Sequence, residues 1–147
     1  MLAPGEQLLL GTASVIDESV LLPAYDDAAG VTAEFNRNVL RVLNRTLGAD
    51  FDVDAFAHRA VWDARNEWIE MRLVAERAMR VRLAELPLAV DFAEGEEMCT
   101  EISAKFRPEK VRGMLETAGF AITRVWTDPD DRFALTLATA TDHPAVP

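Results

Sequence analysis

Apolar residues recur at two spacings along this chain, and the two spacings predict its helices and strands. Between Gly30 and Gly48 the apolar residues lie three or four positions apart, which is the period of an α-helix, and Thr32 is a plausible N-cap. The apolar members of this stripe are Phe35, Val39, Leu40, Val42, Leu43 and Leu47. An amphipathic helix is therefore expected to start near Thr32 and to stop at Gly48.

Shorter helices are expected on both sides of this long one. Asp17 or Ser19 can cap a helix that continues through 20–22, with Pro23 tolerated only near its first turn. Towards the C-terminus, a helix is expected to begin at residues 107–110, with proline in its usual first-turn position, and to end at Gly119.

Elsewhere apolar and polar residues alternate, which is the period of a β-strand. The alternating segments are 58–63, 68–76 and 79–83, and 87–92 adds a further strand. We interpret them as an antiparallel meander with one face toward a core and the other toward water. The apolar run 7–11 predicts a strand covered on both faces, and 120–127 with 132–138 predicts a closing hairpin.

Composition and charge narrow the class of protein. The chain has 147 residues and is 50% hydrophobic, enough for a core of ordinary size. A net charge of −10 argues against nucleic acid or an anionic membrane as partner, because phosphates would be repelled. A single cysteine, Cys99, excludes an intrachain disulfide, and no apolar run reaches the length of a membrane span. A cytoplasmic protein that acts on a small molecule is expected.

Common cofactor and metal motifs are missing from the sequence. His58 and His143 are far apart and lie in no metal-ligand spacing, so we interpret both as ordinary surface or loop histidines and expect no metal. The glycines are isolated, and the chain has neither a phosphate loop nor a nucleophile elbow. No residue is assigned as catalytic on this basis.

Two runs of residues are long and unusual. The first, at 25–40, reads Tyr-Asp-Asp-Ala-Ala-Gly-Val-Thr-Ala-Glu-Phe-Asn-Arg-Asn-Val-Leu, and the second, at 100–106, reads Thr-Glu-Ile-Ser-Ala-Lys-Phe. Together they resemble the C-terminal half of the histidine-specific, S-adenosylmethionine-dependent Nα-methyltransferases of ergothioneine biosynthesis. The resemblance extends from about Leu8 to about Leu137.

The resemblance implies an α/β fold: the C-terminal part of a class I, Rossmann-like methyltransferase sheet with an inserted α+β substrate-binding lobe. Residues 1–24 would hold the last parallel strand and helix of the methyltransferase core, 25–106 the inserted lobe, and 107–147 the closing helix and hairpin. The segments near Leu8, Phe120 and Arg132 would be strands five, six and seven. Strands one to four and the S-adenosylmethionine site would lie in a preceding half.

Candidate substrate-binding residues come from the second run. On an extended strand, Glu101 and Ser103 project on the same side. A carboxylate and a hydroxyl so spaced can bond both nitrogens of an imidazole, the carboxylate accepting from a ring N–H. In the family the matching glutamate and serine hold the substrate imidazole, and Met71 matches a methionine that lines the same pocket.

Each candidate also has an ordinary structural interpretation. A glutamate and a serine on a strand commonly form a solvated face, and a methionine in an alternating strand commonly fills a core. The match over all seven residues of the second run favours a functional role for Glu101 and Ser103, and leaves both interpretations open for Met71. No role is assigned to the polar residues Tyr25, Asn36 and Asn38.

The leading hypothesis is therefore a partial histidine Nα-methyltransferase. The family transfers the methyl group of S-adenosylmethionine to the α-amine of L-histidine, and this region alone is expected neither to bind the cofactor nor to be active. Ala13 and Ile16 stand where the family pattern has an aspartate and a lysine. The alternative is a stand-alone, non-catalytic protein for small-molecule binding or association. The expected partners are L-histidine and either a complementing N-terminal half or a second copy bound at an open sheet edge.

Overall fold

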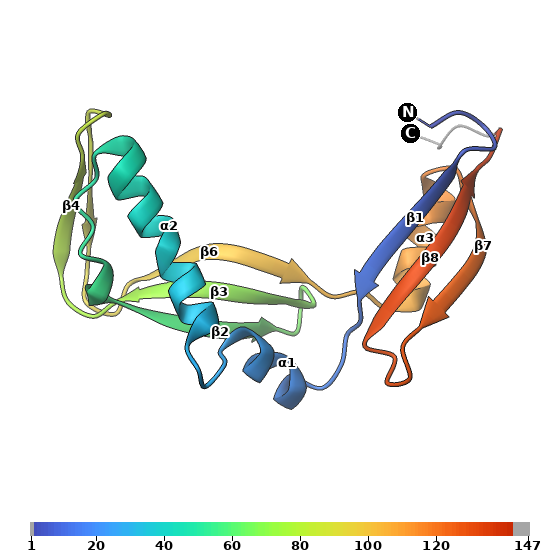
Figure 1. Ribbon diagram of the computed structural model, residues 1–147, viewed down its shortest axis with the longest axis horizontal. Helices are drawn as coiled ribbons and strands as arrows, with labels where there is room; N and C mark the ends of the chain where they lie inside the picture. The colour runs from blue at the N-terminus through green and yellow to red at the C-terminus, as the bar shows by residue number, and fades with distance from the viewer. Residues whose placement is uncertain (1, 143–147) are drawn as a thin grey trace. The chain divides into compact units, whose positions relative to one another are not determined.

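The computed structural model describes residues 2–142 and shows a mixed α/β protein with antiparallel sheets (Figure 1). Its described residues form two compact units. The first contains the chain up to Ile16 and from Ala104 on, and the second is Asp17–Ser103. His143 lies outside the described residues. In the described part of the chain, no helix is long and apolar enough to cross a membrane.

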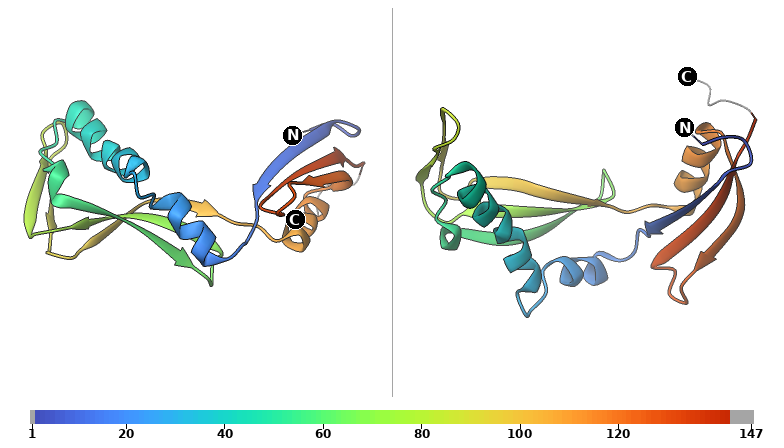
Figure 2. Two further views of the ribbon diagram at one scale, coloured as in Figure 1. Left: turned by 60° about the horizontal axis from the view of Figure 1, so that its bottom comes forward. Right: turned by 45° about the horizontal axis from the view of Figure 1, so that its top comes forward.

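The first unit is a three-stranded antiparallel sheet with one helix (Figure 2). Its strands follow the order β1–β8–β7, and α3 packs beside β7. The bounds are β1 Gln7–Ala13, α3 Pro108–Thr117, β7 Phe120–Thr127 and β8 Phe133–Ala140. Val111 and Leu115 of α3 form a core with Ala138. The expected helix and hairpin are therefore confirmed.

Strand β1 departs from the expectation that both of its faces are covered. Leu8 and Leu10 pack against the core cluster under α3, but Leu9 between them is 60% exposed. The expectation is wrong because, among the described residues of the first unit, a helix covers this sheet on one face only. Among the described strands, β1 pairs with β8 alone and forms the sheet edge. Self-association through this edge stays a prediction, which light scattering at high concentration would check.

The second unit contains two helices, a short 3-10 helix and two sheets. Strand β6 lies beside β3 in a β2–β3–β6 sheet, and β4 and β5 form a separate hairpin. The bounds are α1 Glu18–Tyr25, α2 Val31–Leu47, η1 Val53–Ala55, β2 Phe56–Asp63, β3 Trp68–Ala75, β4 Met79–Leu83, β5 Leu88–Phe92 and β6 Glu97–Ala104.

The expected single meander is wrong at β4 and β5. At the far end of β3, Ala75 exchanges backbone hydrogen bonds with the turn that precedes β6, to Glu96 (2.9 Å) and from Gly95 (2.8 Å). These bonds bring β6 into the place beside β3 that a meander would give to β4. Residues 76–96 then close on themselves as a hairpin.

The sequence predicts boundaries between the two parts after residues 24 and 106, whereas the structure places the unit boundaries after Ile16 and after Ser103. Helix α1 contacts β2 and β3, so it belongs to the second unit together with the residues from Asp17 on. The second boundary falls between Ser103 and Ala104. The assignment of the two units to a methyltransferase core and an inserted lobe remains a proposal.

The helix ends show which side chains satisfy the free backbone groups. Asp17 caps α1 by accepting from the N–H of Ser19 (2.8 Å). Helix α2 is capped by Asp27 rather than by the expected Thr32, since its carboxylate accepts from the N–H groups of Val31 (3.1 Å) and Thr32 (2.8 Å). Gly48 ends α2 in the left-handed conformation, as expected.

The Asp27 cap predicts a pH dependence. Hydrogen bonds from Thr32, and a smaller one from Val31, lower the pKa of Asp27 from 3.8 to about 2. Because the folded pKa lies below the unfolded one, the stabilisation is present above pH 4 and is lost as the pH falls toward about 2. We expect Asp27→Asn to flatten the pH dependence of the urea unfolding midpoint in this window.

The matched control is Asp26→Asn, because Asp26 is the preceding, exposed aspartate and its side chain caps nothing in the described structure. This variant should keep the wild-type slope. Equal slopes for the Asp27 variant and the wild type would contradict the capping role.

Candidate functional site

The predicted site residues lie on neighbouring strands of the β2–β3–β6 sheet. Glu101 and Ser103 are both on β6, so the strand period places them on the same side of it. Glu101 is exposed, and its carboxylate makes no hydrogen bond or ion pair with any described residue. The Ser103 hydroxyl is half-buried and lies 2.8 Å from the Tyr25 hydroxyl at the end of α1.

Met71 lies on β3, beside β6. Its side chain is 4% exposed and shares the buried face of β3 with Ile69 and Leu73. Its backbone carbonyl accepts a hydrogen bond from the Thr100 hydroxyl (2.9 Å). The backbone of Met71 is therefore tied to the strand of the candidate site, while a contact of its side chain with a ligand stays a prediction.

His58 is neither a surface nor a loop histidine, and that interpretation was wrong. It is a half-buried residue of β2 with both ring nitrogens bonded. Nε2 lies 2.8 Å from the carbonyl oxygen of Tyr25, and Nδ1 lies 2.9 Å from the Asn36 amide nitrogen. Because a carbonyl only accepts, Nε2 carries the proton, and Nδ1 accepts from Asn36.

Asn36 is a buried polar residue of α2 that is 4% exposed. Its amide nitrogen also donates to the Arg72 carbonyl (3.1 Å), and its oxygen accepts from the Thr100 hydroxyl (2.5 Å). The sequence contains a signal for this role, since position 36 falls on the same helical face as Ala33 and Leu40, which are both buried. By contrast, the Asn38 side chain is exposed and makes no hydrogen bond with any described residue.

Charged side chains on β2, β3 and β6 form a second network, which does not include Glu101 or Ser103. Arg72 on β3 bonds Glu70 (2.5 Å) and also Glu97 on β6, and Arg59 on β2 bonds Glu97 (2.5 Å). The Arg72 guanidinium lowers the pKa of Glu70 and of Glu97 by donating hydrogen bonds to both carboxylates. The arginines therefore favour the anionic form of these two glutamates, and no arginine pairs with Glu101 among the described residues.

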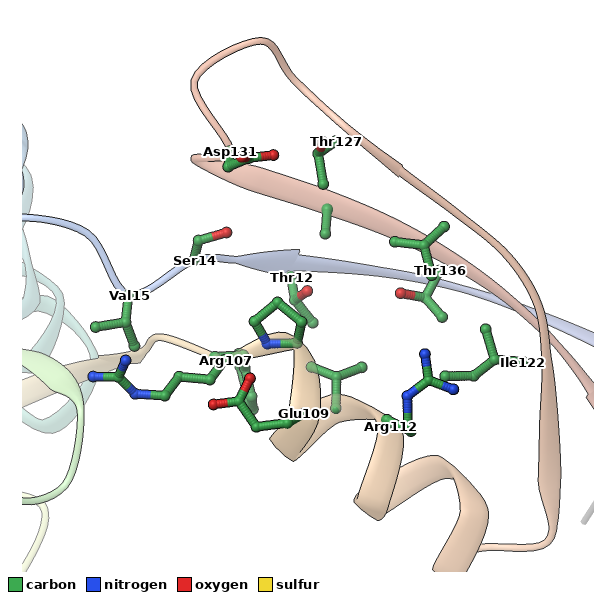
Figure 3. Close-up of a pocket in the computed structure, with 15 residues that line it drawn as sticks. Thr12, Ser14, Val15, Arg107, Glu109, Arg112, Ile122, Thr127, Asp131 and Thr136 are labelled. Carbon is green, nitrogen blue, oxygen red and sulfur yellow. The ribbon is translucent and has the colours of Figure 1, made fainter.

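The first unit contains a cavity of about 360 Å³ between the start of α3 and the sheet (Figure 3). Its lining mixes apolar side chains with hydroxyls and both charges. The polar and charged members are Thr12, Ser14, Arg107, Glu109, Arg112, Thr127, Asp131 and Thr136. None of the predicted site residues lines it, and in the described part of the chain no three His, Cys, Asp or Glu side chains gather as a metal site.

Comparisons with known proteins identify relatives over nearly the whole chain. Residues 1–140 match the sequence model of a family described as histidine-specific methyltransferase, SAM-dependent. The histidine N-alpha-methyltransferase of Mycolicibacterium smegmatis is 60% identical over 137 residues, which are 93% of this chain and 43% of that protein. The histidine N-alpha-methyltransferase of Mycobacterium tuberculosis is 55% identical over 138 residues, 94% of this chain and 43% of that protein.

A more distant relative is the N-methyltransferase dtpB of Aspergillus flavus. It is 25% identical over 130 residues, which are 88% of this chain and 36% of the relative. The chain thus spans less than half the length of each of these curated relatives.

Proposed function

Because the chain belongs to the family of histidine-specific, S-adenosylmethionine-dependent methyltransferases, we propose that it supplies the part of such an enzyme that recognises the imidazole of L-histidine. The methyl group of S-adenosylmethionine would then be transferred to the α-amine of the bound histidine. The observation that carries this proposal is the Glu101 carboxylate, which pairs with no described residue and lies two positions from Ser103, whose hydroxyl has a neighbour in Tyr25.

These groups complement a neutral imidazole, which has one N–H and one lone-pair nitrogen. The Glu101 carboxylate accepts from the ring N–H. The Ser103 hydroxyl, which lies 2.8 Å from the Tyr25 hydroxyl, would hydrogen-bond the second ring nitrogen. Two bonds of defined direction would distinguish histidine from amino acids without ring nitrogens.

The sheet order supports the proposed placement within a class I methyltransferase fold. The resemblance implies strands five, seven and six as neighbours, and the first unit has β1, β8 and β7 in that order, with β8 antiparallel to both of its neighbours. We propose that the first unit is this end of the methyltransferase sheet and that Asp17–Ser103 is the inserted substrate-binding lobe.

The residues present do not fit an S-adenosylmethionine site. Such a site uses a glycine-rich turn between a strand and a helix, where the backbone approaches the cofactor closely. Gly11 is the only glycine within a described strand, and a Cβ atom there would lie 2.7 Å from the Phe133 ring. The space beside this glycine is therefore filled by a side chain.

We expect no binding of S-adenosylmethionine to the purified 147-residue chain in a calorimetric titration. The full-length Mycolicibacterium smegmatis relative serves as the positive control. A micromolar dissociation constant for the chain alone would show that the cofactor contacts have been misplaced.

The proposed function is tested by a chimera in which this chain replaces the matched 137 residues of the Mycolicibacterium smegmatis relative. We expect the chimera to methylate L-histidine and to leave L-phenylalanine unchanged. A folded chimera that methylates neither amino acid would contradict the proposal. Supplying the remainder of the relative as a separate chain would test complementation.

The competing hypothesis is a non-catalytic protein that uses this region to bind a small molecule or to associate. Ala13 and Ile16 favour it, since the family pattern has charged residues at both positions. Under this hypothesis the chimera would bind L-histidine without transferring a methyl group, and restoring both charged residues would restore transfer.

A further inference from the structure

We propose that Asn36, His58 and Thr100 are positioning residues that hold Tyr25 and Ser103 in place around Glu101. This inference rests on the proposed function, since it concerns the same imidazole site. The three residues come from α2, β2 and β6 and are joined in one chain of hydrogen bonds within Asp17–Ser103.

The first step is the placement of Tyr25. It is the last residue of α1, where backbone carbonyls have no partner within the helix. His58 supplies that partner, because its Nε2–H donates to the Tyr25 carbonyl (2.8 Å). His58 thus holds the backbone of the residue whose hydroxyl lies 2.8 Å from the Ser103 oxygen.

The second step is the orientation of His58 by Asn36. The Arg72 carbonyl can only accept, so the group of Asn36 that faces it at 3.1 Å is the amide nitrogen. A flipped amide would place two oxygens in contact there. The same nitrogen donates to His58 Nδ1, which leaves Nε2 as the protonated nitrogen that reaches Tyr25.

The third step is the attachment of β6. The Thr100 hydroxyl lies 2.5 Å from the Asn36 oxygen and 2.9 Å from the Met71 carbonyl, and its single proton is shared between these two acceptors. Thr100 directly precedes Glu101, and Ser103 follows two residues later. Glu101 therefore lies between two residues that are anchored to the helices, one to α2 and the other to α1.

Burial makes the arrangement specific. Asn36 is 4% exposed, its amide nitrogen donates to His58 Nδ1 and to the Arg72 carbonyl, and its oxygen accepts from Thr100, so protein groups satisfy both ends of the buried amide. An apolar residue at position 36 would continue the buried face of α2 but would leave His58 Nδ1, the Arg72 carbonyl and Thr100 without this partner. Satisfied buried polar networks of this kind favour one arrangement of the groups that they join.

The test compares two substitutions of Thr100 in the whole chain. Thr100→Val keeps the shape and removes the hydroxyl, whereas Thr100→Ser keeps the hydroxyl. We expect amide hydrogen exchange at 100–104, measured by NMR, to be about two- to tenfold faster in Thr100→Val and unchanged in Thr100→Ser, as the loss of one neutral hydrogen bond predicts. Thr46→Val is the control, because Thr46 is an exposed residue of α2 whose hydroxyl donates to Val42 within the helix.

The second measurement reads the His58 ring directly. Nitrogen-15 NMR of the wild-type chain should show a protonated Nε2 and an unprotonated Nδ1. Asn36→Ala should weaken this preference, because it removes the donor to Nδ1 while the Tyr25 carbonyl still accepts from Nε2. A wild-type ring with its proton on Nδ1 would overturn the inference. If Asn36→Ala does not fold, the amide exchange of the Thr100 variants still tests the inference. Equal exchange rates at 100–104 in Thr100→Val and Thr46→Val would overturn the inference.

The positioning role is separated from the proposed function by kinetics in the chimera. Thr100→Val should raise the KM for L-histidine about two- to tenfold with a smaller change in kcat, and Thr100→Ser should restore the wild-type KM. An unchanged KM in Thr100→Val, in a chimera that still depends on Glu101, would overturn the positioning role alone. If instead the proposed function is wrong, the chimera without further substitutions would show no preference for histidine. The amide exchange and His58 ring measurements would then still give the results expected for the positioning role.

Discussion

In a chimera that methylates histidine, replacing Glu101 by alanine is expected to lower kcat/KM for L-histidine about ten- to a hundredfold. The reason is the loss of a charge-assisted hydrogen bond to a ring N–H, worth about 1.5–3 kcal/mol. Ser103→Ala should cost less, since a neutral hydrogen bond contributes about 0.5–1.5 kcal/mol. Initial rates at varied L-histidine concentration measure both effects.

Two controls make this result specific. Glu94→Ala removes another exposed glutamate, in the turn before β6, that makes no ion pair with any described residue, and it should leave the rate unchanged. L-phenylalanine has a ring of similar shape without N–H groups. If Glu101→Ala left the preference for histidine over phenylalanine intact, Glu101 would not be the residue that recognises the imidazole.

The second large effect is expected on stability. Phe56→Ala should lower the free energy of unfolding by about 3–5 kcal/mol, because truncation of a fully buried phenylalanine leaves a cavity. Phe56 is 0% exposed and packs edge to face against Phe92, with ring centroids 5.4 Å apart, and against Phe51 at 6.0 Å. Urea unfolding followed by circular dichroism measures the change.

The matched control is Phe35→Ala. Phe35 lies on α2 but is 65% exposed, so its truncation should change stability by no more than about 0.5 kcal/mol. Similar losses in the two variants would mean that Phe35 is covered in solution and that the exposed face of α2 is an interface.

The helix stripes and the alternating strands are local patterns, and they determined most of the secondary structure. The stripe from Phe35 to Leu47 predicts α2 with its end at Gly48, because a glycine readily adopts the left-handed conformation that closes a helix. Tertiary contacts decided the strand pairing instead. Alternation marks β4 as a strand, but it does not say that β6, which is more distant in sequence, lies beside β3.

In the candidate site, too, some features follow from the sequence and others only from the tertiary structure. The spacing of Glu101 and Ser103 on one strand follows from the sequence, since the period of a strand is two residues. The hydrogen bonds around them join residues that are distant in sequence: Tyr25 and Ser103 are 78 positions apart, and Asn36 and Thr100 are 64 positions apart. No local pattern encodes such pairs.

His58 shows the physical reason most clearly. Its place in the sequence lacks any ligand spacing, and only the packing of α1 and α2 against β2 brings a carbonyl and an amide to its two ring nitrogens. The sequence by itself determined which segments are helices and strands and which residues resemble an imidazole site. The tertiary structure decided which polar groups meet, because hydrogen-bond partners are set by distance in space and not by separation along the chain.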